Sequence, residues 1–187
     1  MSYIDTLQRH QSLFANLGEL EKDVTLLAEH IENCIKSGGK ILFMGNGGSA
    51  ADCQHLAAEF VVRYKAERQP IAAMALTVDS SILTAHANDY DFSSVFTRQV
   101  QAFCQPKDLV IGISTSGSSA NVIDAIREAR QIGACCWSWT GVKKGQLDDL
   151  SDHVIKVPCD ETARIQEAHI FIGHWLCEEI DRRITES

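Results

Sequence analysis

The chain has 187 residues, enough to bury a full hydrophobic core, and its 45% hydrophobic and 22% charged residues are typical of soluble globular proteins. Its formal net charge of −8, with no cluster of Lys and Arg, argues against nucleic acid as a direct partner. The same charge repels an anion, so a phosphorylated ligand must be held locally by backbone amides, hydroxyls and helix N-termini.

The first predicted element is an amphipathic helix, with a further helix expected before it. Apolar side chains recur at helical spacing and a glycine C-cap ends the pattern at Ser37-Gly38-Gly39. The apolar positions are Leu20, Val24, Leu27, Ile31 and Ile35. Residues 1–38 are therefore predicted to be a helical segment.

Strands and helices alternate along the rest of the chain. Short apolar runs predict five strands, at 40–44, 71–76, 109–113, 134–139 and 153–157. Helical patterns fall between them at 49–64, 92–103 and 121–131, and a last amphipathic helix carries Ile165, Ala168, Ile172, Leu176 and Ile180. This alternation is typical of a buried parallel sheet. We therefore predict a three-layer α/β/α sandwich around a parallel five-stranded sheet, with residues 39–187 as the α/β core of a single domain, 1–187.

The spacing of the cysteines and the first residues of the chain indicate in which cellular compartment the protein is expected. The seven cysteines include no C-x-x-C pair and no regular spacing, which favours a reducing environment. Residues 1–10 lack the basic and apolar regions of a signal peptide, and no apolar run approaches the roughly 18 residues that a membrane span needs. We expect a cytoplasmic protein without membrane contact.

The first candidate ligand loop is Gly45-Asn46-Gly47-Gly48-Ser49-Ala50, between a predicted strand and a predicted helix. Its backbone can approach a ligand closely, although the same sequence also suits a tight turn without a ligand. The loop matches the G-x-G-x-x-A pattern of dinucleotide-binding proteins, which need an acidic residue about 20 positions on, at the end of the next strand. Here that strand ends near Asp79, more than 30 positions after Gly48, which disfavours a nucleotide-dependent oxidoreductase.

The second candidate loop is Ser114-Thr115-Ser116-Gly117-Ser118-Ser119, again between a strand and a helix. Its hydroxyls and free amides at a positive helix end could cradle a phosphomonoester, or they could form only a serine-rich helix cap. Two such loops after two strands of one parallel sheet favour the ligand, because ligands bind outside the carboxyl ends of strands.

Titratable side chains follow on two helices. His55 and Glu59 lie four positions apart and so share a helix face, where they could hold a proton or a metal, or form only a surface ion pair. The last helix carries a second polar group, which proves little by itself because such side chains often lie at a core boundary. Its members are Gln166, Glu167, His169 and His174.

Together these segments resemble the SIS sugar-phosphate-binding family, and within it the phosphoheptose isomerases, over nearly the whole chain. The matching stretches are Gly45-Asn46-Gly47-Gly48-Ser49-Ala50-Ala51-Asp52, His55-Leu56-Ala57-Ala58-Glu59, Ala87-Asn88-Asp89-Tyr90, residues 113–121, and Arg164-Ile165-Gln166-Glu167 with His174. The resemblance implies the flavodoxin-like SIS fold. It also implies an aldose–ketose isomerase that converts sedoheptulose 7-phosphate to D-glycero-D-manno-heptose 7-phosphate, the first step of ADP-heptose biosynthesis for the lipopolysaccharide core.

The resemblance also implies roles for individual residues. The acid/base pair falls on Glu59 and His174, and one zinc ion per subunit falls on His55, Glu59, Gln166 and His174. The implied sugar-phosphate-binding residues are Asn46, Gly47, Gly48, Asn88, Asp89, Ser114, Thr115, Ser116, Ser119 and Gln166. The family further implies a homotetramer with active sites at subunit interfaces.

Two questions stay open at this stage. The non-catalytic alternative is a sugar-phosphate sensor or a replication-initiator-associating protein. Proteins of the second kind share the fold but bind a protein, and they resemble the family with the metal-pair glutamate lost, so Glu59 favours the enzyme. The zinc set raises a geometric difficulty, because Gln166 and His174 are eight positions apart, about 12 Å along a helix. Their side chains must lean together, the helix must begin late, or different subunits must contribute.

Overall fold

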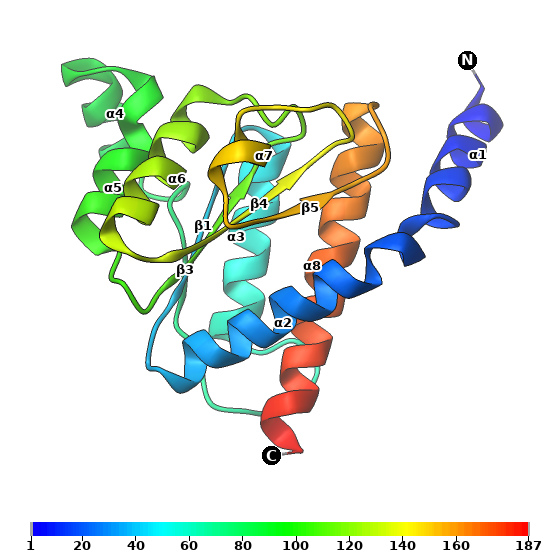
Figure 1. Cartoon of the computed structure of the whole chain (residues 1–187), viewed down its shortest axis with the longest axis horizontal. Helices are drawn as coiled ribbons and strands as arrows, with labels where there is room; N and C mark the ends of the chain where they lie inside the picture. Colours follow the sequence, from blue (N-terminus) through cyan, green and yellow to red (C-terminus); the bar gives the residue numbers. More distant parts are fainter. Residues whose placement is uncertain (1, 187) are drawn as a thin grey trace.

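The computed structural model describes residues 2–186, built around one parallel sheet (Figure 1). Its order is β2-β1-β3-β4-β5, with every neighbouring pair parallel. The strands are β1 (Ile41–Gly45), β2 (Ala73–Ala75), β3 (Leu109–Ile113), β4 (Cys135–Thr140) and β5 (His153–Lys156). The five predicted strands and the parallel sheet are therefore confirmed, with ends shifted by one or two residues.

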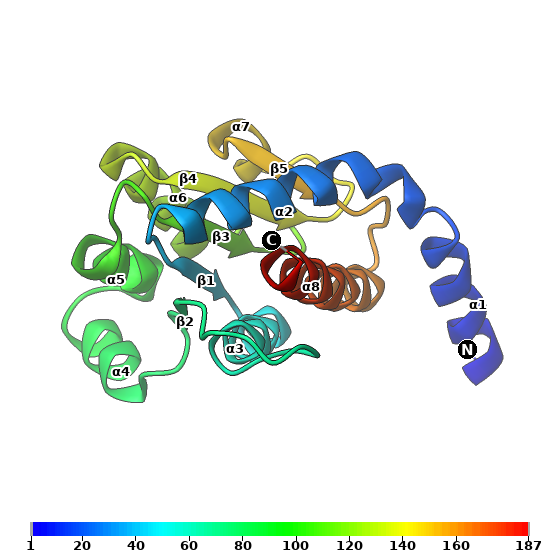
Figure 2. The same cartoon turned by 90° about the horizontal axis from the view of Figure 1, so that it is seen from below.

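Helices cover both faces of the sheet. One face carries α2 (Glu21–Lys36), α3 (Gly48–Val61) and α8 (Thr162–Thr185), and the other carries α5 (Val95–Phe103) and α6 (Ala120–Ile132). Figure 2 views this layering from below. The predicted three-layer sandwich is thus confirmed, and the glycine C-cap after Ile35 does end α2, at Lys36.

Two apolar cores lie on opposite sides of the sheet because successive strand side chains point to opposite faces. Phe43 of β1 and Trp137 of β4 belong to the core beneath α2, α3 and α8. Leu42 and Val110 belong to the core beneath α5 and α6. All five residues of β1 and of β3 are buried, as expected for central strands whose two faces are both covered.

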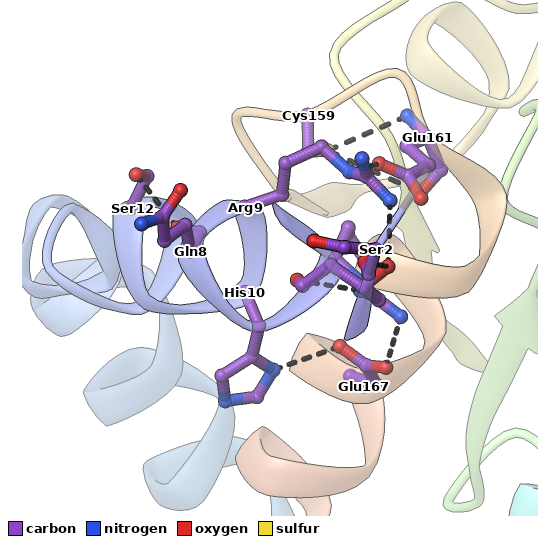
Figure 3. A network of polar contacts seen from close by, with 10 residues as sticks. Ser2, Gln8, Arg9, His10, Ser12, Cys159, Glu161 and Glu167 are labelled. Carbon is purple, nitrogen blue, oxygen red and sulfur yellow. Dashed lines mark hydrogen bonds and ion pairs between the residues drawn. The ribbon is translucent and has the colours of Figure 1, made fainter. Parts of the chain in front are cut away.

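The N-terminal segment is helical, as predicted, and docks on the start of α8. It consists of α1 (Tyr3–Phe14) and the 3₁₀ helix η1 (Leu17–Leu20) ahead of α2. Arg9 Nε lies 3.0 Å from a Glu161 carboxylate oxygen, and His10 Nδ1 lies 2.8 Å from one of Glu167 (Figure 3). Glu167, named in the sequence for its place beside Gln166, therefore serves this contact.

Two short helices were not predicted, α4 (Ser80–Asp89) and α7 (Leu147–Leu150). The 3₁₀ helix η2 (Phe92–Ser94) forms the start of the helix predicted at 92–103. No residue of α4 is buried, and Figure 1 shows it projecting beyond α5. Among residues 2–186, none of the helices combines the length and the apolar character that crossing a bilayer requires.

Candidate active site

The two candidate loops meet at the carboxyl edge of the sheet. Gly45 ends β1 and pairs in register with Ile113, the last residue of the neighbouring β3. A Cβ added to Gly45 would lie 2.9 Å from the Ile113 carbonyl oxygen, so only glycine allows this approach. From here α3 leaves for one face of the sheet and α6 for the other, which makes the edge the topological switch point where open α/β sheets bind ligands. α8 begins at the same edge, after β5.

The Ser/Thr loop runs from the end of β3 into α6, as predicted. The Ser114 and Ser119 hydroxyl oxygens lie 2.8 Å apart, and the Ser116 hydroxyl lies 3.4 Å from that of Ser114. Gly117 turns the loop with a φ of 66°. The Ser119 side chain makes no capping hydrogen bond to α6, so its hydroxyl is not committed to the helix it precedes.

A reciprocal pair of side-chain amides joins the two loops. Asn46 Nδ2 donates to Asn121 Oδ1 at 2.9 Å, and Asn121 Nδ2 donates to Asn46 Oδ1 at 2.8 Å. Asn121 lies in the first turn of α6 and is buried. The side chain of Asn46, which the resemblance assigns to substrate binding, is therefore engaged with Asn121, while its backbone remains part of the loop.

Three of the titratable side chains predicted to act together do meet, between α3 and α8. His55 Nε2 lies 2.8 Å from His174 Nε2 and 3.6 Å from Glu59 Oε1. The helices pack closely here because α8 has Gly173 at the contact, where an added Cβ would lie 2.4 Å from a Leu56 methyl. The cluster is formed within a single chain.

The environment of His174 favours its neutral form. Burial lowers the pKa of His174, the neighbouring His55 lowers it further, and Glu59 opposes both effects. Its ring stacks on Tyr64, with centroids 5.7 Å apart and planes at 20°. A neutral imidazole that is held in place by stacking can accept a proton or bind a metal.

Gln166 also lies between α3 and α8, but nearer the start of both helices than His55 and His174. α3 and α8 run in the same direction, and the Gln166 amide lies against Gly48 at the start of α3, where an added Cβ would be 2.4 Å from Gln166 Nε2. Burial raises the pKa of Asp52, while a hydrogen bond with Gln166 and the proximity of His55 oppose this. Gln166 thus borders the glycine loop, and Asp52 lies between it and His55.

Asn88 and Asp89 lie apart from these groups in the described chain. Both are exposed at the end of α4, and Asn88 Nδ2 donates to Asp89 Oδ1 at 2.9 Å. Among residues 2–186, neither side chain forms a hydrogen bond with the glycine loop or the Ser/Thr loop. Their predicted role in binding stays a prediction.

Known proteins share much of this sequence. Residues 2–141 match the family model of the SIS domain. The phosphoheptose isomerase of Maridesulfovibrio salexigens is 49% identical over 181 residues, 97% of this chain and 87% of that protein. Phosphoheptose isomerase 1 of Campylobacter jejuni is 49% identical over 174 residues, 93% of this chain and 94% of that protein. The chain belongs to the SIS family, among the phosphoheptose isomerases.

Two solved relatives support the fold of this SIS domain. The structure of phosphoheptose isomerase from Neisseria gonorrhoeae matches it with a TM-score of 0.89 and 39% identity, covering 95% of this chain and 96% of that one. The structure of a phosphoheptose isomerase from Francisella tularensis matches with a TM-score of 0.85 and 33% identity, covering 97% and 100%. The predicted SIS fold is therefore confirmed.

The residues that the resemblance assigns to zinc are of types that bind that metal. Two ligands of one tetrahedral zinc stand about 3.3 Å apart, given metal–nitrogen distances of about 2.0–2.1 Å. The separations of 2.8 Å from His55 to His174 and 3.6 Å from His55 to Glu59 are close to that value. Within residues 2–186, however, no group of three or more His, Cys, Asp or Glu side chains is arranged to hold a metal as it stands.

Two contacts in the candidate site were missed from the sequence. Tyr64 stacks on His174, although the sequence placed it only at the end of a helix. Asn121 holds Asn46, although the sequence placed it only at the start of a helix and at the end of a stretch that matches the family. Only their positions in the sequence could have indicated these contacts. Asn121 is an amide in the first helical turn after the Ser/Thr loop, and Tyr64 is an aromatic residue five positions after Glu59.

Proposed function

We propose that this chain isomerises sedoheptulose 7-phosphate to D-glycero-D-manno-heptose 7-phosphate, an aldose–ketose interconversion at the start of ADP-heptose biosynthesis for the lipopolysaccharide core. The observation that carries the proposal is the meeting of His55, Glu59 and His174 between α3 and α8. The relatives named phosphoheptose isomerase support the same reaction. They also favour catalysis over the alternative, a non-catalytic protein that binds a sugar phosphate or a replication initiator.

The Ser/Thr loop is the proposed phosphate site. Ser114, Thr115, Ser116 and Ser119 offer hydroxyls beside the N-terminus of α6, where the helix dipole favours an anion. The glycine loop and Gln166 border the sugar on the α3 side, and Asn88 and Asp89 are proposed to complete its binding.

Glu59 and His174 are the proposed acid/base pair. Isomerisation moves one proton from C1 of the ketose to C2 through an enediol, and another between the two oxygens. Glu59 takes the C1 proton and returns it at C2, and His174 transfers the oxygen proton. All protons removed are returned, so the reaction needs no external oxidant or reductant.

One zinc ion per subunit is proposed as the cofactor, held by His55, Glu59, Gln166 and His174. When bound, zinc would supply Lewis-acid polarisation of the carbonyl and hydroxyl oxygens. A carboxylate is a weaker base on a metal than off it, so the proposal requires Glu59 to be released when sugar is present. Metal analysis of the purified protein tests this, and a metal-free protein with full activity would exclude the zinc.

The proposed assembly is a homotetramer of single-domain subunits, 1–187, with active sites at subunit interfaces. Apolar side chains on α1 and α8 are exposed, among them Tyr3 at 78%, Ile4 at 55% and Phe171 at 48%. Phe171 also lines a cavity of about 350 Å³, together with Phe14 and Trp175. Burying such surface against other copies would stabilise an oligomer. Sedimentation in solution is the direct check.

The proposed location is the cytoplasm. All seven cysteines are free thiols in the structure, and burial raises the pKa of Cys34 and Cys135 to about 11 each. Thiols of this kind suit a reducing compartment. Fractionation of cells that express the full chain would test it.

The experiment that tests the reaction is incubation of the purified protein with sedoheptulose 7-phosphate, followed by NMR. A heptose 7-phosphate should accumulate to an equilibrium ratio, while fructose 6-phosphate in a parallel sample should turn over far more slowly. Faster turnover of fructose 6-phosphate would overturn the heptose assignment, and turnover of neither sugar would favour the binding-protein alternative.

A further inference from the structure

Arg68 is buried beside the proposed base although it lies outside every motif. Its side chain is only 1% exposed, and Nε donates to Asp181 Oδ1 at 2.5 Å. Nη2 donates to the Glu59 carbonyl and Nη1 to the Phe60 carbonyl, each at 2.9 Å. One guanidinium therefore joins α8 to the backbone of the residue proposed as the base.

These two carbonyls need an external donor. α3 ends at Val61, and the last four carbonyls of a helix have no amide partner within it. Arg68 supplies that partner for Glu59 and, together with the Ile71 amide at 3.1 Å, for Phe60. The backbone at Glu59 is thus fixed by a planar fork of donors, a geometry that lysine cannot reproduce.

Asp181 anchors the other end of the contact. It is 4% exposed as a side chain, and it accepts hydrogen bonds from the Lys65 and Ala66 amides at 2.8 and 2.9 Å. Asp181 lies seven positions after His174 on α8, which is close to two helical turns, so the two residues share a face. The segment that follows α3 is thereby tied to the helix that carries the proposed acid.

We propose that Arg68 and Asp181 form a clasp that positions Glu59 against His174. This inference rests on the proposed roles of Glu59 and His174, since it assigns the clasp to that acid/base pair. Arg68 touches only the Glu59 backbone, and so it is a positioning residue. Loss of the clasp frees the last turn of α3, and the carboxylate then spends less time at the distance that proton transfer requires.

The test compares Arg68→Lys and Asp181→Asn with the control Glu178→Gln. Glu178 binds Lys65 of the same segment at 2.8 Å, but this pair is exposed and touches no α3 carbonyl. In both clasp variants we expect kcat per folded molecule to fall by about 10- to 100-fold, because small displacements of a reacting group cost that much. KM should change by less than about twofold, because neither substitution alters the Ser/Thr loop proposed to bind the phosphate. Amide hydrogen exchange at residues 59–62 should accelerate, and the control should match the wild type in every measurement.

Each outcome decides the proposal. If Asp181→Asn does not fold, the test rests on Arg68→Lys alone. This variant keeps the positive charge opposite Asp181 and loses only the planar guanidinium donors. If Arg68→Lys has the same kcat per folded molecule as the wild type, the clasp is refuted. The same holds if its loss of total activity is no larger than the fraction of the variant that is unfolded. The variant Glu59→Gln separates the two proposals: full activity there would refute the proposed role of Glu59 itself, whereas an inactive Glu59→Gln beside a fully active Arg68→Lys would refute only the clasp.

Discussion

Asn46 and Asn121, 75 positions apart, exchange two side-chain hydrogen bonds of 2.9 and 2.8 Å. Each amide uses one donor and one acceptor, so the pair closes a ring between the loop after β1 and the first turn of α6. The spacing between the two proposed binding loops is therefore fixed by side chains as well as by the sheet.

Asn121→Ala should weaken substrate binding without abolishing catalysis. It removes both hydrogen bonds and leaves the Asn46 amide unpaired, at a cost of about 1–2 kcal/mol, which is roughly a 5- to 30-fold rise in KM. Steady-state kinetics measure this. The control is Asn16→Ala, which removes an exposed amide that bonds only locally, to the Ser12 carbonyl. An unchanged KM for Asn121→Ala would show that the loops keep their spacing without the pair.

Replacing Ser114, Thr115, Ser116 and Ser119 together by alanine should chiefly reduce affinity for the phosphorylated sugar. Each lost hydrogen bond to a charged group is worth about 1.5–3 kcal/mol. Calorimetric titration with the sugar phosphate measures the change, and circular dichroism checks the fold. Normal binding by a folded variant would place the phosphate elsewhere.

Gly48→Ala should displace Gln166, because the new methyl would lie 2.4 Å from Gln166 Nε2. We expect kcat/KM to fall by roughly 10-fold or more, the effect of a forced side-chain movement of about 1–3 kcal/mol. Gly18→Ala is the matched control, since its added Cβ would meet nothing within 4 Å. Equal activity of the two variants would mean that Gln166 has no part in the site.

Mixing inactive Glu59→Gln and His174→Ala chains should not restore activity. Both residues meet within one chain, each beside His55, so every mixed site still carries one defect. The chains would be unfolded, combined, refolded and assayed beside refolded wild type. Recovered activity would show that Glu59 and His174 of one site come from different subunits.

The stability of the α8 C-terminus should depend on pH through Glu179. A hydrogen bond from Arg182 lowers the pKa of Glu179 to about 2; burial opposes this and a hydrogen bond from Arg183 reinforces it. A carboxyl whose pKa is lower in the folded chain stabilises the fold fully above its unfolded value, near 4.3, and loses that stabilisation as the pH falls towards 2. Urea midpoints of Glu179→Gln should therefore lie below those of the wild type at pH 6 and converge with them near pH 2. A pH-independent difference would contradict this.

The sheet could be predicted because its central strands are buried on both faces. β1 and β3 are continuous apolar runs, which no amphipathic helix produces. α4 could not be predicted, since it buries no side chain and so has no apolar stripe to detect. The prediction also extended the helix after the glycine loop to residue 64, although the structure ends it at Val61, where Arg68 donates to the Glu59 and Phe60 carbonyls.

For the candidate site, the sequence predicted that His55 and Glu59 share a helix face, but it could not predict their contacts with other helices. The i, i+4 spacing of His55 and Glu59 placed them on one face, whereas the approach of His174 depends on how α8 packs on α3 through Gly173. The contact of Arg68 with Asp181 joins positions 113 apart, and no local pattern encodes it. Such contacts follow from the tertiary fold alone.

The convergence of α3, α6 and α8 at one edge of the sheet has a kinetic consequence. Helix dipoles act only within about the first turn, whereas the net charge of −8 acts at longer range. A phosphorylated sugar is therefore repelled until it almost touches the site, and then it is attracted. Because added salt screens the long-range repulsion first, moderate ionic strength should speed substrate association, the reverse of its effect on an enzyme that steers its substrate with a basic surface.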